Sequence, residues 1–303
     1  MLWIWLTIFA ALMQSVRTAA QKRLAERMSL WAATYVRALV GLPVMLAWLA
    51  GLLGWTGEPL PRPNAAFLVL CLVTAVTQNL GTALLLSLFR LKSFAAANQL
   101  AKSDVILTAL LGLPLGQWIT PAGWVAILLA MAGVAVISSA RGAGDAGLGT
   151  MSWREMARAP VLRIGLGVGL MFAICNLALR EATLSLETGS VLARAGITVV
   201  VSTLLQVLLL GAWLGRREPG ALGAILGNAR LSAFVGVTSA VGSICWFAAF
   251  ASTNAGYVRA VGQIEVVFSV LLSLVYFRER LTPHDWLGIA LTVAGILVLR
   301  LAG

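Results

Sequence analysis

Long apolar runs separated by short polar stretches make up almost the whole chain. A helix needs ~20 mainly apolar residues to cross the ~30 Å hydrocarbon core of a bilayer, and ten runs are about that long. They are too long and too uniformly apolar for barrel strands, in which polar and apolar residues alternate. The runs occupy approximately residues 3–21, 30–53, 65–88, 95–113, 121–140, 161–179, 188–214, 231–251, 257–277 and 284–301. This pattern predicts an all-α integral membrane protein with ten transmembrane helices.

Helix-breaking residues and composition support this interpretation. The segment from Gly57 to Pro63 ends the second run, Pro121 opens the fifth, and Pro283 opens the tenth. Of the 303 residues, 60% are hydrophobic and 11% are charged, whereas soluble domains have ~45–50% and ~25%. Ten spans leave about 100 residues for loops and ends, so a large soluble domain is excluded.

An internal repeat divides the chain. Residues 120–137 and 282–299 align without a gap, are identical at eight of eighteen positions, and both begin with Thr-Pro-x-x-Trp. We infer a first five-helix repeat at residues 1–140, a linker at 141–160 and a second repeat at 161–303. Because each repeat has an odd number of spans, the second enters the membrane from the opposite side. The repeats are therefore inverted, an arrangement used by secondary transporters.

These features resemble the ten-helix EamA type of the drug/metabolite transporter superfamily. The resemblance rests on the two halves, on Arg37 and Arg194 early in the second and seventh runs, and on the motifs that begin at Thr120 and Thr282. Glu279 supplies the glutamate of the family's Glu-x-Leu-Thr-Pro pattern. The resemblance implies export or exchange of small metabolites, often amino acids, through a central cavity lined mostly by helices one, three, four, six, eight and nine. It also implies that helices five and ten pack together at the rear.

Two runs carry ionisable residues inside the predicted membrane, where each costs ~2.5–3.5 kcal/mol on insertion scales. The fourth run contains Lys102 and Asp104, and the ninth contains Arg259, Gln263 and Glu265. Lys102 and Asp104 are two residues apart, so on one helix they point in different directions and do not pair with each other. Glu265 is either a proton carrier or the fixed partner of a basic group such as Lys102, and Asp104 is the competing proton site. Arg259 either faces the site or extends to the headgroups.

Polar residues on other helices complete a predicted substrate site, with the alternative that they only hold helices together. Trp246 fits either stacking on a substrate or packing. Arg37 and Arg194 recur in both halves, which favours a shared scaffold role at least as strongly as substrate binding. The predicted substrate-binding residues are Gln14, Gln78, Asn79, Asn98, Lys102, Asn176, Trp246, Arg259 and Gln263, with Asp104 and Glu265 for proton coupling.

The predicted function is secondary transport, because the chain has no Walker motif for direct use of ATP. We expect an exporter or exchanger of small polar metabolites that works by alternating access, with amino acids as the leading class. The basic residues in the spans favour organic anions or carboxylated or phosphorylated metabolites as an alternative. Trp246 and Glu265 favour a choline-like cation. No enzyme, cofactor or metal is expected, since one histidine (His284) and three scattered cysteines form no catalytic or metal-binding pattern.

The net charge of +11 comes from Lys and Arg scattered between apolar runs. This distribution is typical of loops at lipid headgroups and not of a nucleic-acid surface. About 14 of the 22 basic residues fall in odd-numbered loops, against about 3 in even-numbered loops and the ends. The positive-inside rule then places both termini outside. We expect a multi-pass protein of the inner (cytoplasmic) membrane, a monomer whose partners are the bilayer and a small-molecule substrate.

Overall fold

The computed structural model describes residues 2–91, 101–142, 160–277 and 282–302. This part of the chain is built of helices and contains no strand. Before the predicted linker the elements are α1 (Leu2–Ala25), α2 (Leu30–Thr56), α3 (Ala65–Leu91), α5 (Asp104–Gly112), the 3-10 helix η1 (Leu113–Leu115) and α6 (Pro121–Gly142). After it they are α8 (Pro160–Leu184), α9 (Val191–Arg217), α10 (Ala221–Gly227), α11 (Ala229–Ser252), α12 (Ala255–Gly262), α13 (Ile264–Phe277) and α14 (Pro283–Ala302).

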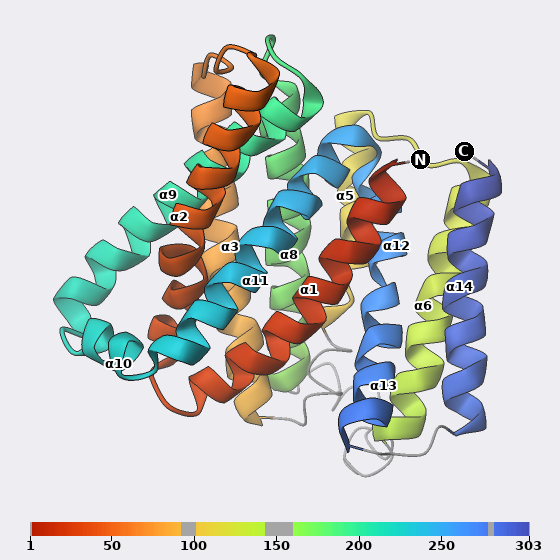
Figure 1. The fold of residues 1–303 in the computed structure, drawn as a ribbon. Helices are drawn as coiled ribbons and strands as arrows, with labels where there is room; N and C mark the ends of the chain where they lie inside the picture. Colours follow the sequence, from red (N-terminus) through yellow and green to blue (C-terminus); the bar gives the residue numbers. More distant parts are fainter. Residues whose placement is uncertain (1, 92–100, 143–159, 278–281, 303) are drawn as a thin grey trace.

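The described helices suit a membrane protein in length and composition. Seven are long and apolar enough to cross a bilayer, and two shorter apolar segments cover Asp104–Leu115 and Pro121–Ile137. The helices run back and forth as a bundle, and both marked chain ends lie at the same end of it (Figure 1). The prediction of an all-α integral membrane protein is confirmed.

Helix packing follows a two-fold pattern between the halves. α6 and α14, the last helix of each half, lie side by side and run in opposite directions (Figure 1). α3 packs along α8, and the equivalent pair with the halves exchanged is α11 along α1. In the same way, α5 contacts α8, and its equivalents α12 and α13 contact α1. Each contact therefore has a counterpart in which the two halves exchange places, as inverted repeats require.

Small residues allow α6 and α14 to approach closely. A Cβ on Gly133 would lie 2.5 Å from the carbonyl oxygen of Gly288, and one on Gly295 would lie 2.7 Å from that of Ala126. Gly133 aligns with Gly295 in the repeat, and Ala126 aligns with Gly288. The two contacts are thus related by the same two-fold pattern. Close approach of backbones is a main source of packing energy between helices in lipid.

Two predicted spans are interrupted. The ninth, predicted as one helix over 257–277, divides into α12 and α13 at a turn on Gln263. The fourth, predicted over 95–113, has a turn at residues 102–103 before α5, and residues 95–100 lie outside the described part. The prediction of a continuous ninth helix was wrong, because apolar length does not reveal a backbone break that surrounding protein groups satisfy. The short helix α10 was also not predicted.

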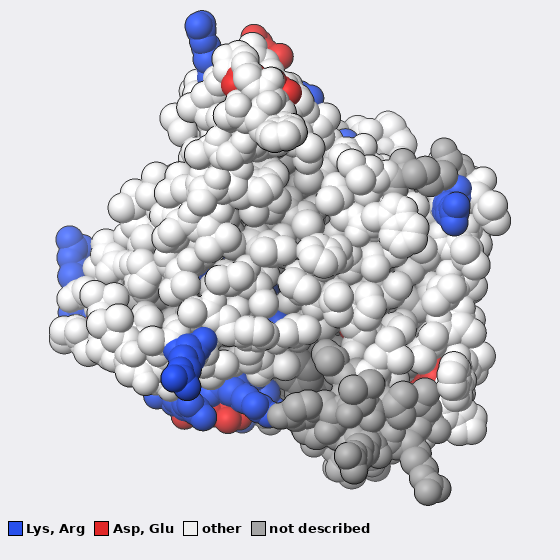
Figure 2. Space-filling view, viewed as in Figure 1, with Lys and Arg blue, Asp and Glu red and all other residues white. Residues whose placement is uncertain are grey.

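Charged side chains gather at the ends of the molecule and leave a wide uncharged band between them (Figure 2). Many large apolar side chains are exposed, among them Leu208, Val125 and Leu128. The largest visible basic group lies at the end opposite the marked termini, where α1 leads into α2 and α9 leads into α10 (Figures 1 and 2). The uncharged band is the surface that acyl chains would cover.

Candidate functional site

The two interruptions place an acidic residue at the start of a helix in each half. Asp104 is the first residue of α5, and Glu265 lies in the first turn of α13. The partial positive charge of a helix N-terminus favours a carboxylate there. Because α5 and α12 are in contact, the two interruptions meet between the halves. Interrupted helices at the interface of two repeats commonly form the substrate and ion sites of secondary transporters.

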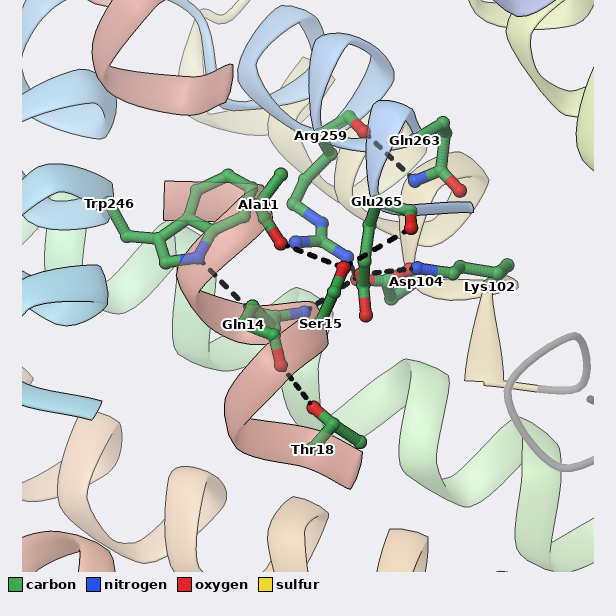
Figure 3. A network of polar contacts seen from close by, with 10 residues as sticks. All are labelled: Ala11, Gln14, Ser15, Thr18, Lys102, Asp104, Trp246, Arg259, Gln263 and Glu265. Carbon is green, nitrogen blue, oxygen red and sulfur yellow. Dashed lines mark hydrogen bonds and ion pairs between the residues drawn. The ribbon is translucent and has the colours of Figure 1, made fainter. Parts of the chain in front are cut away.

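Glu265 is the centre of a buried polar network (Figure 3). Its Oε2 lies 2.6 Å from the Nζ of Lys102, and the two side chains are only 4% and 7% exposed. Gln14 on α1 donates from Nε2 to the same carboxylate oxygen at 3.0 Å. The Ser15 hydroxyl donates to the Glu265 backbone carbonyl at 3.2 Å. Of the two roles that the sequence left open for Glu265, the structure contains the ion pair with Lys102.

Asp104 forms the second ion pair of the site, with Arg259 on α12. Asp104 is 1% exposed and Arg259 is 7% exposed, so Arg259 does not extend to the headgroups. The Asp104 Oδ1 has no hydrogen-bond partner among the described residues. Gln263 donates from Nε2 to the Arg259 carbonyl at 3.0 Å, within the interruption itself. The fourth and ninth spans are therefore joined by two crossed ion pairs.

Trp246 on α11 connects the network to the eighth span. Its Nε1 donates to the Gln14 Oε1 at 3.0 Å, and the Arg259 guanidinium lies over its ring, 5.2 Å from the centroid. A Cβ on Gly262 would lie 2.6 Å from the Trp246 Cη2 atom. The indole thus occupies the space that this glycine leaves open beside the break. Trp246 therefore packs against Gly262 and also holds the side chains of Gln14 and Arg259 in position.

A second polar group centres on Arg37 of α2. Arg37 is 5% exposed, and it donates to the hydroxyls of Thr82 at 3.1 Å and Ser239 at 3.4 Å. Gln78, one turn before Thr82 on α3, donates to the same Thr82 hydroxyl at 3.4 Å and accepts from the Cys175 thiol at 3.2 Å. In the part of the chain that the structure describes, all partners of Arg37 are therefore neutral.

Arg17 on α1 is a further cation of the site. Its charge attracts Glu265 and repels Arg37. Its Nε is buried without a hydrogen-bond partner among the described residues. The four basic residues and two carboxylates of the site, taken together, belong to α1, α2, the turn before α5, α5, α12 and α13.

The remaining predicted residues have different positions. Asn176 on α8 donates to Thr108 at 3.4 Å, one turn beyond Asp104 on α5, and so borders the site. Asn79 donates to the backbone carbonyl of Gln206 on α9 at 3.4 Å, which places its amide at a helix contact. Asn98 lies outside the described residues.

Sequence reasoning left Arg17, Ser15 and Arg37 out of the site. Arg17 follows Gln14 by three residues, so a helical face containing both was a usable signal. Arg37 was paired with Arg194 as a shared scaffold. In the structure Arg194 donates to the Leu186 carbonyl beside the start of its own helix, whereas Arg37 reaches two other helices. The two equivalent arginines thus have different surroundings.

The site offers charge and hydrogen bonds for a small polar molecule. Within the described residues there is no group of three His, Cys, Asp or Glu that could hold a metal ion. Cys71, Cys175 and Cys245 are free, the first two buried and the third half-buried. The arrangement therefore suits recognition of a charged metabolite by ion pairs and hydrogen bonds.

Comparison with known proteins agrees with this architecture. Among solved structures, a chain titled "Crystal structure of protein" has a TM-score of 0.69 and 17% sequence identity, with 98% of this chain and 96% of that chain covered. At this identity the likeness shows a shared fold. No curated protein sequence matches the chain. The model of the EamA-like transporter family matches residues 1–139 and again residues 161–301. With two copies of the family's unit covering nearly its whole length, the chain belongs to the EamA-like transporter family of membrane proteins.

Proposed function

We propose that the chain is a secondary transporter that exports or exchanges small polar metabolites through the buried network around Glu265. The observation that carries this proposal is the pair of crossed ion pairs, Lys102 with Glu265 and Arg259 with Asp104, at the interruptions of two equivalent helices. Charges inside a membrane protein are costly and generally mark a substrate or ion pathway. Transport by a family member needs such a pathway between its two halves.

Alternating access is the proposed mechanism, in which the halves rock about the network. At the end of the molecule with the termini, loops of the two halves are joined by a few polar contacts. The Ser190 backbone N–H donates to Glu58 Oε2 at 2.9 Å, and the Asn64 amide donates to the Ser185 carbonyl at 2.7 Å. Exposed contacts of this kind add little to stability, so a rocking motion breaks them easily.

Asp104 and Glu265 are the proposed sites of proton coupling. Asp104 pairs with Arg259 and Glu265 pairs with Lys102. Each carboxylate is also within reach of the charges of neighbouring basic groups. Protonation of either carboxylate would release its basic partner and add to the positive charge of the site. Proton binding would then favour the binding of a carboxylate-bearing cargo, which is a direct physical route to proton-coupled transport.

The surroundings of Trp246 favour a carboxylate-bearing cargo over a choline-like cation. An aromatic cage for a cation needs a free ring face and a carboxylate, but the Trp246 ring already carries Arg259 and Glu265 is bonded to Lys102 and Gln14. Basic groups outnumber carboxylates in the site. Amino acids and organic anions, both of which carry a carboxylate, are therefore the cargo classes that the chemistry supports.

We further infer that the basic end of the molecule faces the cytoplasm. Arg23 and Arg27 lie where α1 leads into α2, Arg216 and Arg217 at the end of α9, and Arg230 at the start of α11, all at this end of the molecule. Basic loops are retained on the cytoplasmic side. Both termini then lie outside, and the chain resides in the inner membrane.

Flux measured in liposomes tests the proposed function. The purified chain is reconstituted and given a panel of labelled leucine, glutamate, succinate, glycerol 3-phosphate and choline. The expected result is uptake of at least one carboxylate-bearing compound, recovered chemically unchanged and at a rate above that of protein-free liposomes. Recovery of an altered compound would indicate an enzyme, and no uptake of any compound would contradict the proposal.

A further inference from the structure

Arg37 is a buried cation whose partners in the described structure are all neutral. It is 5% exposed, and its two hydrogen bonds are to the hydroxyls of Thr82 and Ser239. Hydroxyls satisfy N–H donors without compensating the positive charge. An uncompensated buried charge destabilises a protein. Arg37 therefore has an energetic cost that its visible partners do not offset.

Arg17 increases this cost instead of relieving it. The two guanidinium groups repel each other, and Arg17 has a buried Nε without a partner among the described residues. Glu265 attracts Arg17, but that carboxylate forms its ion pair with Lys102. The other carboxylate, Asp104, pairs with Arg259. Both acidic groups of the site are thus engaged by other cations.

The described site as a whole has two more positive than negative charges. Its cations are Arg17, Arg37, Lys102 and Arg259, and its anions are Asp104 and Glu265. Each carboxylate already neutralises one cation. The excess is located at the two arginines, which belong to α1 and α2 and have the planar donor arrangement that matches carboxylate and phosphate oxygens.

We propose that Arg17 and Arg37 together bind the anionic group of the cargo, so that the transporter prefers a small organic anion with net negative charge to a neutral amino acid. The anionic group is a carboxylate or a phosphate. This inference rests on the proposed transport function and names the substrate class of that site. It assigns recognition of the anion to the two arginines without an acidic partner, and leaves Lys102 and Arg259 as partners of the carboxylates.

Thermal stability and ligand binding together distinguish this role from a scaffold role. If Arg37 only held α2 to α3 and α11, Arg37→Gln would lower the melting temperature of the ligand-free protein. If Arg37 instead binds the anionic group of the cargo, Arg37→Gln removes the repulsion between Arg37 and Arg17. The ligand-free variant should then melt at the same temperature as the wild type or higher. The conservative Arg37→Lys variant keeps the charge and provides a second, less disruptive test of anion binding.

The experiment uses the full chain in detergent and in liposomes, with succinate and glycerol 3-phosphate as anionic probes and leucine as the neutral probe. Binding is measured as the ligand-dependent rise in melting temperature. The expected result is that at least one anion stabilises and is transported by the wild-type protein, while leucine is a weaker ligand. Arg17→Gln and Arg37→Gln should each weaken anion binding by roughly tenfold or more. The matched control Arg23→Gln, at an exposed position of α1, should bind as the wild type does.

Three outcomes of the ligand experiments would overturn the inference, and they distinguish its failure from that of the proposed function. Transport of leucine with neither binding nor transport of the anions would contradict the anionic substrate class and leave the transport function standing. Anion transport that Arg17→Gln and Arg37→Gln leave unchanged would contradict the assignment to these arginines. Absence of flux for every probe would contradict the inference and the transport function together. Stabilisation by succinate alone or by glycerol 3-phosphate alone would identify the anionic group as carboxylate or phosphate.

Discussion

The Nζ of Lys102 lies 2.6 Å from the Oε2 of Glu265, and this ion pair joins the fourth span to the ninth at the point where both are interrupted. The two residues are 163 positions apart in the chain. They meet because the two halves pack with their equivalent helices in contact. The second ion pair, between Asp104 and Arg259, crosses between the same two spans. Two buried ion pairs thus connect the two halves.

Removal of one partner of the first ion pair should destabilise the protein more than removal of both. Lys102→Met leaves Glu265 as a buried anion with a lost partner, at a cost of about 3–5 kcal/mol. Lys102→Met combined with Glu265→Gln removes both charges and should recover much of that loss. Unfolding curves in detergent for the two single variants and the double variant measure the coupling. A double variant that loses the sum of the two single effects would show that the pair contributes no coupling.

Neutralising the carboxylates should uncouple cargo movement from protons. In Asp104→Asn, in Glu265→Gln or in both, uptake driven by an imposed pH gradient should fall to the rate seen without a gradient. Exchange of internal for external cargo should continue, because it needs no net proton transfer. Flux in liposomes with and without the gradient measures both. Full proton-driven uptake by the double variant would exclude these residues as the coupling sites.

Gly262→Ala should disturb the site through Trp246. The added methyl group would lie 2.6 Å from the indole, so the ring must shift away from Gln14 and Arg259. We expect flux to fall by about tenfold with little loss of folded protein, since displacements of about 1 Å at a site have effects of this size or larger. Gly51→Ala is the matched control, because a Cβ there has nothing within 4 Å. Equal flux in the two variants would count against a role for Trp246 in positioning.

Gly133→Ala should weaken the contact between α6 and α14. The new Cβ would lie 2.5 Å from the Gly288 carbonyl oxygen, and overpacking of this kind costs about 1–3 kcal/mol. The melting temperature in detergent should fall relative to wild type and to Gly51→Ala. An unchanged melting temperature would show that α6 and α14 accommodate the added methyl group at no cost in stability.

The contact between Glu58 and Ser190 should give a pH-dependent contribution to stability. Hydrogen bonds from the Ser190 backbone N–H and hydroxyl lower the pKa of Glu58 below its ordinary value of 4.5. A lowered pKa in the folded state stabilises the protein above the unfolded value, and this contribution is lost as the pH falls through the folded value. Wild type should therefore melt above Glu58→Gln at about pH 7, and the difference should shrink as the pH falls below the ordinary pKa of Glu58. A difference that grows on acidification would reverse the assigned sign.

The helical membrane fold and its two halves could be predicted from the sequence, because the length of an apolar run and the Thr-Pro-x-x-Trp motif are each visible within a single segment. The contact of Gly133 with Gly288 lies in the segments that the repeat aligned. The interruption at Gln263 did not follow, because a backbone break inside an apolar run depends on groups of other helices that come close only after folding. The same holds for Arg37. Its difference from Arg194 depends on which side chains from other helices reach it.

The most direct test of the account is the accessibility of Cys175, whose thiol lies beside Gln78 in the polar group around Arg37. A variant that keeps Cys175 as its only cysteine is reconstituted and exposed to a membrane-impermeant thiol reagent from either side. The control variant keeps only Cys71, which is buried in the same apolar cluster as Cys175 but has no hydrogen bond to the polar group among the described residues. If the region between the halves opens alternately, the reagent reaches Cys175 from both sides, cargo slows the labelling, and Cys71 stays unlabelled. Protection of Cys175 from both sides, equal to that of Cys71, would contradict a transport pathway between the two halves.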